Sequence, residues 1–255
     1  MRVDSFGRTD IGRRRENNED AFLRDDEVGF YLVADGVGGN ARGEVASAQA
    51  VEEALGFVRT GRAAIDAYLR DANEGTHALR RLVESAMQHA CYMVFGLGQL
   101  DPTRRGMSTT MSSLLLVGRQ TPGLGVVGQV GDSRVYLVRD RKIVQLTEDH
   151  TLLNFKLKHG LITAEEAPFA PGRNVITRAV GHRDYVQVDT CEIDARPGDV
   201  FLLCSDGLHG HLQDPEIVPI LEAGPIEEAA SRLIDEANAR GGRDNITAVV
   251  VTIRG

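Results

Sequence analysis

Four short stretches, far apart in the chain, each place an aspartate where an apolar strand is expected to begin or end. They are FYLVADGVGG with Asp35, GQVGDSR with Asp132, FLLCSDG with Asp206 and GGRDNITAVVV with Asp244. Anionic oxygens that converge in one place need a cation to neutralise them. The four stretches therefore predict a metal-dependent enzyme whose ligands come from distant parts of the chain.

The Asp35-Gly36 pair is suited to holding a hard cation. An apolar strand fixes the carboxylate on a rigid element, and the glycine lets the backbone turn sharply and present its own carbonyl oxygen. Mg²⁺ and Mn²⁺ prefer such oxygen ligands and usually keep several waters, which suits chemistry at phosphate oxygens. A lone Asp-Gly is most often an ordinary turn. Repetition favours the metal site, because three aspartates share the layout of strand, Asp and small residue: Asp35, Asp132 and Asp206.

A second acidic group lies near the N-terminus, in RRRENNEDAF. Arg15 stands shortly before the carboxylate pair Glu19 and Asp20, at the start of another expected strand. The planar fork of an arginine binds two phosphate oxygens at once, so Arg15 is a candidate for holding phosphate. The alternative interpretation of the basic run at residues 13–15 is a solvated charged surface.

Composition excludes several classes of function. The 255 residues carry a formal net charge of -8, and 42% of them are hydrophobic. Such an acidic chain creates no general positive field, so we expect neither nucleic-acid nor membrane binding. The N-terminus shows no apolar signal sequence, and no segment is long enough to span a bilayer, which favours a cytoplasmic protein. Three separated cysteines predict buried thiols in a reducing compartment: Cys91, Cys191 and Cys204.

The elements that must position these residues are expected within one domain, residues 1–255, because no linker or repeat divides the sequence. Three helices follow a 3.6-residue period, one after Gly43, one after Thr76 as its N-cap, and one from Pro225 to Gly241. Residues 60–75 are expected to form a surface connection with a short helical pattern. Strands are expected at residues 20–25, 28–34, 109–118, 123–131, 133–139, 186–193, 199–204 and 246–253.

The grouping of these elements predicts the fold class. Several expected strands are continuously apolar, which indicates that both of their faces are covered. Strands in blocks, with long helices inserted between the blocks, favour an α+β fold in which helices sandwich the sheets. Residues 149–181 form the longest segment without strong periodicity, so they are predicted to be a mobile flap that contains a short helix.

Eight motifs occur in a fixed order between Arg15 and Thr247: RENNED, VADGVGG, GMSTT, VGDSRVY, LTEDH, VITRAVG, LLCSDGL and GGRDNIT. In this order they resemble the metal-dependent protein phosphatases of the 2C type, the PPM family, in their compact bacterial form. The ordered set is far more specific than any one motif. The resemblance implies a central antiparallel β-sandwich flanked by helix pairs on both faces, a four-layer αββα arrangement, with a flap subdomain at about residues 149–181.

The resemblance also implies ligands for two core ions, Mn²⁺ or Mg²⁺. The match at VADGVGG makes Asp35 similar to the carboxylate that bridges the two ions, with the Gly36 carbonyl on one of them. The matches at LLCSDGL and GGRDNIT make Asp206 and Asp244 similar to ligands of the other ion.

Further positions match the family more peripherally. Asp20, with Glu19 beside it, resembles the acidic pair that holds metal-bound waters. Asp132 resembles the residue that binds a weaker third ion together with the residue at Asp206.

Substrate-side roles are implied in the same way. Arg15 resembles the phosphate clamp, and Asn245 a polar neighbour of the site. Arg178 in the flap is a candidate for reaching phosphopeptide, and a structural salt bridge is an equal alternative. The chain departs from the family pattern at Val37 and Asn40, where other members carry histidines. A metal-bound water is therefore the expected proton donor to the leaving group, in place of a side chain.

The implied activity is hydrolysis of phosphoserine and phosphothreonine in proteins by a metal-activated water, countering a cognate bacterial Ser/Thr kinase. The expected partners are phosphorylated proteins, and the expected state is a monomer. One alternative is a catalytically weak or regulatory phosphoprotein-binding module of the same fold, whose usual sign is a lost ligand. Another is a structural calcium site, which the absence of a closely spaced acidic loop in the sequence disfavours.

Overall fold

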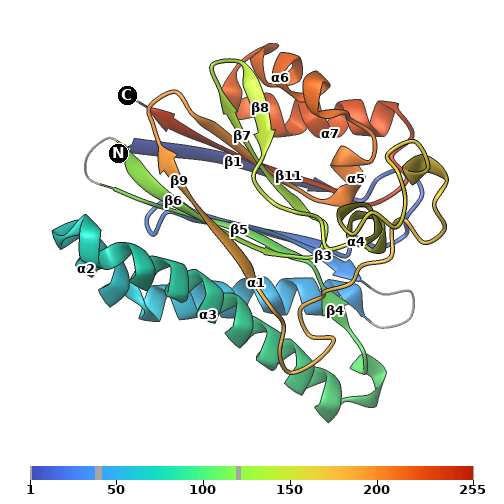
Figure 1. Cartoon of the computed structure of the whole chain (residues 1–255), viewed down its shortest axis with the longest axis horizontal. Coiled ribbons are helices and arrows are strands. Elements are labelled where there is room, and N and C mark those ends of the chain that lie inside the picture. The colour runs from blue at the N-terminus through green and yellow to red at the C-terminus, as the bar shows by residue number, and fades with distance from the viewer. Residues whose placement is uncertain (1, 38–41, 119–121, 255) are drawn as a thin grey trace.

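Two antiparallel β-sheets packed face to face form the centre of the molecule (Figure 1). The computed structural model describes residues 2–37, 42–118 and 122–254. One sheet consists, in spatial order, of β1 (Arg2–Asp10), β11 (Ile246–Arg254), β10 (Val200–Cys204), β7 (Arg134–Arg139) and β8 (Lys142–Gln145). The other consists of β2 (Asp20–Asp25), β3 (Phe30–Val37), β5 (Met111–Val117), β6 (Gly123–Val130) and β9 (Asp189–Ala195), with β4 (Ser108–Thr109) paired to β3.

Helices cover the outer face of each sheet, which gives four layers (Figure 1). The β2–β9 sheet is covered by α1 (Gly43–Thr60), α2 (Arg62–Arg70) and α3 (Ala72–Leu100). The β1–β8 sheet is covered by α5 (Asp206–His209), α6 (Asp214–Glu222) and α7 (Ala229–Ala239). Short 3₁₀ turns lie at Pro102–Arg104, Ala167–Phe169 and Ile226–Glu228. The described residues contain no helix with the length and apolar character that crossing a membrane requires.

Three apolar layers explain why several central strands contain continuous apolar runs. Successive side chains of a strand point to opposite faces of its sheet. In β3, Phe30 and Leu32 pack against the helices, whereas Tyr31 and Val33 pack against the other sheet. The same alternation holds in β11, where Val249 joins the layer between the sheets. The α+β sandwich expected from the sequence is therefore confirmed, and the apolar runs reflect coverage on both faces.

Among the elements that were not predicted, three carry a weak local signal. The edge strand β1 is polar and only partly buried, with Ser5 as its one buried residue. Its conformation depends on pairing along the whole of β11, from Arg2 opposite Arg254 to Asp10 opposite Ile246. The edge strand β8 has four residues, none of them buried. Helix α6 contains an internal proline, and packing against α7 stabilises it.

Two predicted boundaries are wrong. Thr76 is not an N-cap, because α3 begins at Ala72 and continues through it. Residues 60–75 contain α2, which agrees with the expected short helical pattern, and also the start of α3, which replaces the expected surface connection. Burial of Ile65 against the helix layer supplies the stabilisation that the local sequence lacks. The expected strand at residues 109–118 is divided into β4 and β5 at Thr110, which binds the backbone of Asp35.

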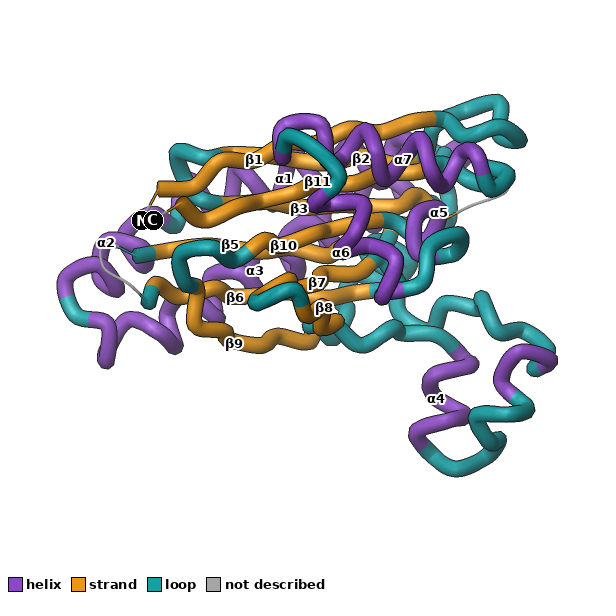
Figure 2. Tube along the Cα trace, turned by 90° about the horizontal axis from the view of Figure 1, so that it is seen from above, coloured by secondary structure: helices purple, strands orange, loops and turns teal. Residues whose placement is uncertain are grey.

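The predicted flap, residues 149–181, projects beyond one end of the sheets (Figure 2). It contains the predicted short helix, α4 (Leu152–Lys158), which begins where the Thr151 hydroxyl accepts a hydrogen bond from the Asn154 amide. Its two ends are joined by a bridge between Thr151 and Ile176. Its mobility stays a prediction.

Candidate active site

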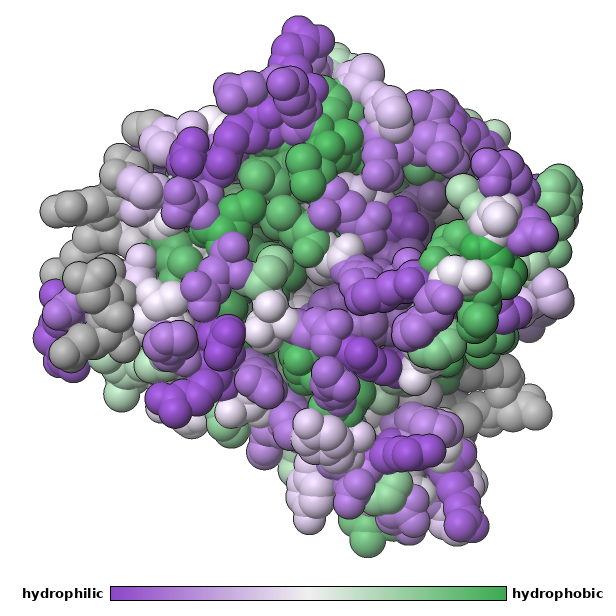
Figure 3. All heavy atoms as spheres, viewed as in Figure 1, coloured by the Kyte–Doolittle hydropathy of each residue, from purple (hydrophilic) through white to green (hydrophobic). Residues whose placement is uncertain are grey.

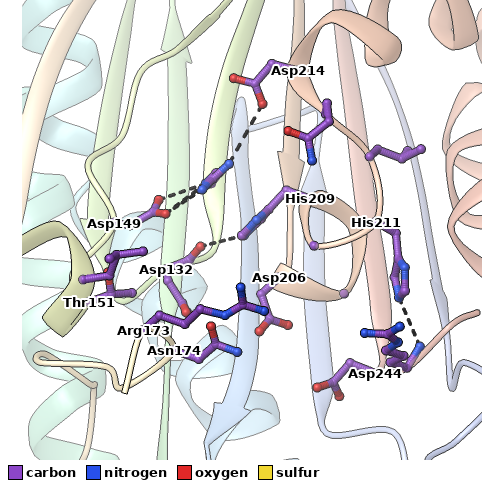
Figure 4. A pocket seen from close by; sticks show the side chains of 17 residues that line it. Asp132, Asp149, Thr151, Arg173, Asn174, Asp206, His209, His211, Asp214 and Asp244 are labelled. Carbon is purple, nitrogen blue, oxygen red and sulfur yellow. Dashed lines mark hydrogen bonds and ion pairs between the residues drawn. The ribbon is translucent and has the colours of Figure 1, made fainter. Parts of the chain in front are cut away.

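Aspartates from five segments meet at one end of the sandwich. Asp35 lies near the end of β3, and its partner in the β2–β3 register is Asp20. Asp206 opens α5 directly after β10, Asp244 stands just before β11, and Asp132 follows β6. Figure 4 shows Asp132, Asp206 and Asp244 pointing into one cavity. The sandwich therefore brings together carboxylates from both of its sheets.

The carboxylates lie close enough to disfavour one another's ionisation. Burial, and then the charges of Asp20, Asp206, Asp132 and Asp244, raise the pKa of Asp35 well above its ordinary value. Burial, and then the charge of Asp206, raise the pKa of Asp132 to about 7. Full ionisation of such a cluster is unfavourable because like charges repel one another, and cations compensate this repulsion.

Within this cluster, two buried carboxylate oxygens have no hydrogen-bond partner among the described residues: Oδ1 of Asp20 and Oδ1 of Asp206. The other oxygen of Asp20, Oδ2, accepts hydrogen bonds of 2.7 Å from the hydroxyls of Ser205 and Thr247. Burial is the main cause that raises the pKa of Asp20 to about 7. Buried carboxylate oxygens without partners are rare, and hard oxygen donors of this kind fit a divalent ion.

No three His, Cys, Asp or Glu side chains among residues 2–37, 42–118 and 122–254 enclose a cation by themselves. Mg²⁺ and Mn²⁺ are usually held by only one or two carboxylates each, with waters completing the shell. The open arrangement of these aspartates agrees with that mode of coordination.

The backbone around Gly36 is held tightly. The Gly36 amide donates to the Glu19 carbonyl at 3.1 Å, and the Thr109 hydroxyl donates to the Asp35 carbonyl at 2.8 Å. A Cβ on Gly36 would lie 2.5 Å from the backbone of Gly43, at the start of α1. Only glycine lets β3 and α1 approach so closely.

Arg15 lies at the rim of the site. Its Nη2 donates to Oδ2 of Asp244 at 2.7 Å, and its side chain is 48% exposed. Asn245, the residue after Asp244, is buried, and its Oδ1 accepts a 2.8 Å hydrogen bond from the Glu19 amide. Its Nδ2 donates to the carbonyls of Ile11 and Asn17. Asn245 therefore joins the segment that carries Arg15 to the loop that carries Asp244.

The other residues singled out from the sequence are Arg178, Glu19, Val37 and Asn40. Arg178 donates to Oδ1 of Asp189 at 2.7 Å, so its structural alternative, a salt bridge, is the one observed. Burial and then the charge of Glu44 raise the pKa of Glu19. Val37 ends β3, and Asn40 lies outside the described residues.

A cleft of about 550 Å³ opens beside α5 and reaches the flap. Asp132, Asp206 and Asp244 line it, together with Arg173 and Asn174 of the flap. Hydrophilic side chains surround this hollow, and apolar side chains gather over α4 (Figure 3). The sequence analysis did not identify the two flap residues, because polar residues in an irregular segment show no periodic signal.

Paired polar groups that line the cleft were also missed. Arg134 binds Asp149 through two nitrogens, with a shortest distance of 2.6 Å. His209 binds the Asp132 carbonyl through Nε2 at 3.0 Å (Figure 4). The motifs VGDSRVY, LTEDH and LLCSDGL contain these residues or adjoin them, so the motifs marked the region without revealing the pairings.

Comparisons with known proteins agree with this geometry. The family model described as Protein phosphatase 2C matches residues 11–229. The chain is 34% identical over 249 residues to protein phosphatase PhpP of Streptococcus pneumoniae, covering 96% of this chain and 95% of PhpP. It is 38% identical over 247 residues to the serine/threonine protein phosphatase PstP of Mycobacterium tuberculosis, covering 96% of this chain and 44% of PstP.

Solved structures show the same likeness. The crystal structure of M. tuberculosis PstP/Ppp superposes with a TM-score of 0.83 at 32% identity, covering 99% of both chains. The PstP catalytic domain in complex with two manganese ions superposes with a TM-score of 0.82 at 31% identity, again covering 99% of both chains. The family resemblance and the fold inferred from the sequence are thereby confirmed. With its cluster of aspartates at one end of the sandwich, this chain belongs to the protein phosphatase 2C family.

Proposed function

We propose that this chain hydrolyses phosphoserine and phosphothreonine in proteins, using divalent ions held by its cluster of aspartates. The observation that carries the proposal is the pair of buried carboxylate oxygens without partners, on Asp20 and Asp206, within a cluster of five aspartates beside Arg15. The relatives PhpP and PstP are protein phosphatases, which supports the same reaction here. Acidic side chains alone would repel a phosphate dianion, so the cluster suits this substrate only when cations neutralise it.

The proposed ions are two of Mn²⁺ or Mg²⁺. Asp35 and the Gly36 carbonyl would hold these ions together with Asp206 and Asp244. The complex of the PstP catalytic domain with two manganese ions supports this number and this metal. When bound, the ions would compensate the negative charge of the phosphoryl oxygens and lower the pKa of a water towards 7.

The neighbouring carboxylates have supporting roles. Asp20 is held by Ser205 and Thr247 through Oδ2, which leaves Oδ1 to accept from a water at the site. Glu19 stands beside it as the second member of this acidic pair. Asp132, together with Asp206, would hold a weaker third ion.

Arg15 would hold the phosphoryl group. A guanidinium presents parallel donors to two phosphate oxygens, and it stays charged throughout the working pH range. The contact of Nη2 with Asp244 fixes one side of the guanidinium at the rim. The partial exposure of Arg15 lets a large phosphoprotein reach it.

Water, and not a side chain, would protonate the leaving serine or threonine oxygen. Val37 carries no ionisable group. His209 lies near the cleft, but burial lowers its pKa to about 4, so its ring stays neutral at pH 7. Its Nε2 is also occupied by the Asp132 carbonyl. His209 is therefore unsuited to act as a general acid at neutral pH.

The substrate would lie in the cleft between α5 and the flap, where a volume of about 550 Å³ accommodates several residues around the phosphorylated one. Arg173 and Asn174 of the flap would contact it. The single-domain organisation over residues 1–255, the cytoplasmic location, the monomeric state and the cognate Ser/Thr kinase stay predictions.

The decisive test compares the wild type with Asp206→Ala, using a phosphothreonine peptide and Mn²⁺. We expect the variant to fold and to lose phosphate release by at least about a thousandfold, because a catalytic ligand is gone. Asp66→Ala, at an exposed position of α2, is the matched control and should keep full activity. Full hydrolysis by Asp206→Ala would contradict the assignment. A wild type that binds the peptide without releasing phosphate would favour the regulatory module.

A further inference from the structure

His150 connects two parts of the molecule that face the cleft. It is the second residue of the flap, and it is 6% exposed. Its Nδ1 accepts a 3.1 Å hydrogen bond from the amide of Gly131, and its own amide donates to the Gly131 carbonyl at 2.8 Å. Gly131 immediately precedes Asp132. One side of His150 therefore holds the loop that carries an aspartate of the site.

The other side of His150 holds the far end of the flap. Its Nε2 lies 3.0 Å from Oδ2 of Asp189, and Oδ1 of Asp189 accepts a 2.7 Å bond from Arg178. The carbonyl of His150 accepts a 2.8 Å bond from the Thr177 amide. Asp189 is the first residue of β9, so the flap is fastened here to the edge of a sheet.

These contacts require one protonation form of the ring. Because the Gly131 amide donates to Nδ1, the ring proton must be on Nε2, where it is donated to Asp189. Nη1 of Arg178, 3.1 Å from the same Nε2, then donates to Asp189 and not to the ring. Burial, as the largest cause, lowers the pKa of His150, which keeps the ring neutral. A neutral ring with a fixed tautomer can accept on one side and donate on the other. Aliphatic and phenyl side chains of similar size can do neither.

We infer that His150 is a positioning residue, which fixes the loop of Asp132 and both ends of the flap relative to one another. Asp132 and the flap residues Arg173 and Asn174 line the same cleft. The His150 side chain therefore helps to set the shape of that cleft, together with the bridge between Thr151 and Ile176 and the backbone bonds of His150. The consequence for substrate rests on the proposed phosphatase function, whereas the mechanical coupling does not.

Three variants separate the two sides of His150. His150→Asn keeps an acceptor near the Nδ1 position for Gly131 but no longer reaches Asp189. Asp189→Ala removes the hydrogen bond between His150 and β9 and leaves His150 in place. His150→Leu removes the side-chain hydrogen bonds to both Gly131 and Asp189. Arg196→Gln is the matched control, because it breaks an exposed ion pair with Asp194 near the other end of β9.

Hydrogen exchange of the metal-free protein tests the coupling without any need for catalysis. We expect His150→Asn and Asp189→Ala to speed amide hydrogen exchange about tenfold at residues 150–178 within the flap, and to leave residues 131–133 protected. His150→Leu should speed exchange in both regions. The control should match the wild type. Should His150→Leu fail to fold, the other two variants still decide the flap side.

Kinetics test the consequence for substrate. Asp189→Ala should raise the KM for a phosphothreonine peptide about fivefold to tenfold, with kcat within about twofold of the wild type. His150→Leu should lower kcat as well. The inference would be overturned if exchange rose evenly over the whole protein, or if the flap stayed protected in Asp189→Ala. A wild type without phosphatase activity would instead refute the proposed function and leave the exchange result standing.

Discussion

Replacing Asp132 by asparagine should stabilise the metal-free protein at alkaline pH. Asp132 is 7% exposed, and burial together with the charges of Asp206 and Asp149 raises its pKa from 3.8 to about 7. The folded protein therefore retains a proton that the unfolded chain has already lost between these two pH values. Stability falls as the pH rises through this window, because the unfolded state becomes the more ionised one.

The size of the effect follows from linkage. A pKa that rises from 3.8 to about 7 corresponds to at most about 4 kcal/mol of destabilisation at pH 8, at about 1.4 kcal/mol per unit. Asparagine has nearly the same shape and cannot ionise. Asp132→Asn should therefore increase the free energy of unfolding by about 2–4 kcal/mol at pH 8 and by much less at pH 5.

Urea unfolding in the presence of a chelator, at pH 5 and pH 8, measures this difference. Asp66→Asn, at an exposed position of α2, is the control and should change the unfolding free energy by less than about 0.5 kcal/mol at both pH values. If Asp132→Asn destabilised the metal-free protein equally at pH 5 and pH 8, the electrostatic interpretation of the cluster would be refuted. Saturating Mn²⁺ should reduce the advantage of the variant, because the charge of Asp132 is then compensated.

Four further outcomes are expected. Arg15→Lys keeps the charge but loses the two-oxygen fork, so kcat/KM for a phosphopeptide should fall about 10- to 100-fold, and an unchanged value in steady-state assays would exclude the clamp. Gly207→Ala would place a Cβ 1.9 Å from the Asn245 carbonyl oxygen, so urea unfolding should show a loss of about 1–3 kcal/mol. A Cβ added at Gly56, on the exposed face of α1, would meet no atom within 4 Å. Gly56→Ala should therefore increase the free energy of unfolding in the same assay by up to about 1 kcal/mol, and a decrease would contradict the packing. Mn²⁺ should raise the thermal unfolding midpoint of the wild type, and Asp206→Ala should reduce this shift in scanning calorimetry.

The amino-acid sequence was sufficient to identify the strands that carry the aspartates. The apolar runs of β3 and β11 and the polar residues at their ends are local signals, because burial on both faces of a strand favours apolar side chains at successive positions. The ordered motifs identified the family for the same reason: each motif lies within one short segment. The stop of the third helix at Gly241 and Gly242, with φ of 127° and 49°, was equally local.

The tertiary structure alone decided which groups surround those aspartates. Oδ2 of Asp20 is bound by Thr247, which lies 227 residues away, and Arg15 is bound by Asp244 across 229 residues. The coupling of the flap through His150 and the edge strand β1 likewise depend on distant segments. Hydrogen bonds and ion pairs have no sequence period, so their partners become known only when the sheets have set the register. The sequence determined where carboxylates end a strand, and the packing of two sheets determined which of them lie close together.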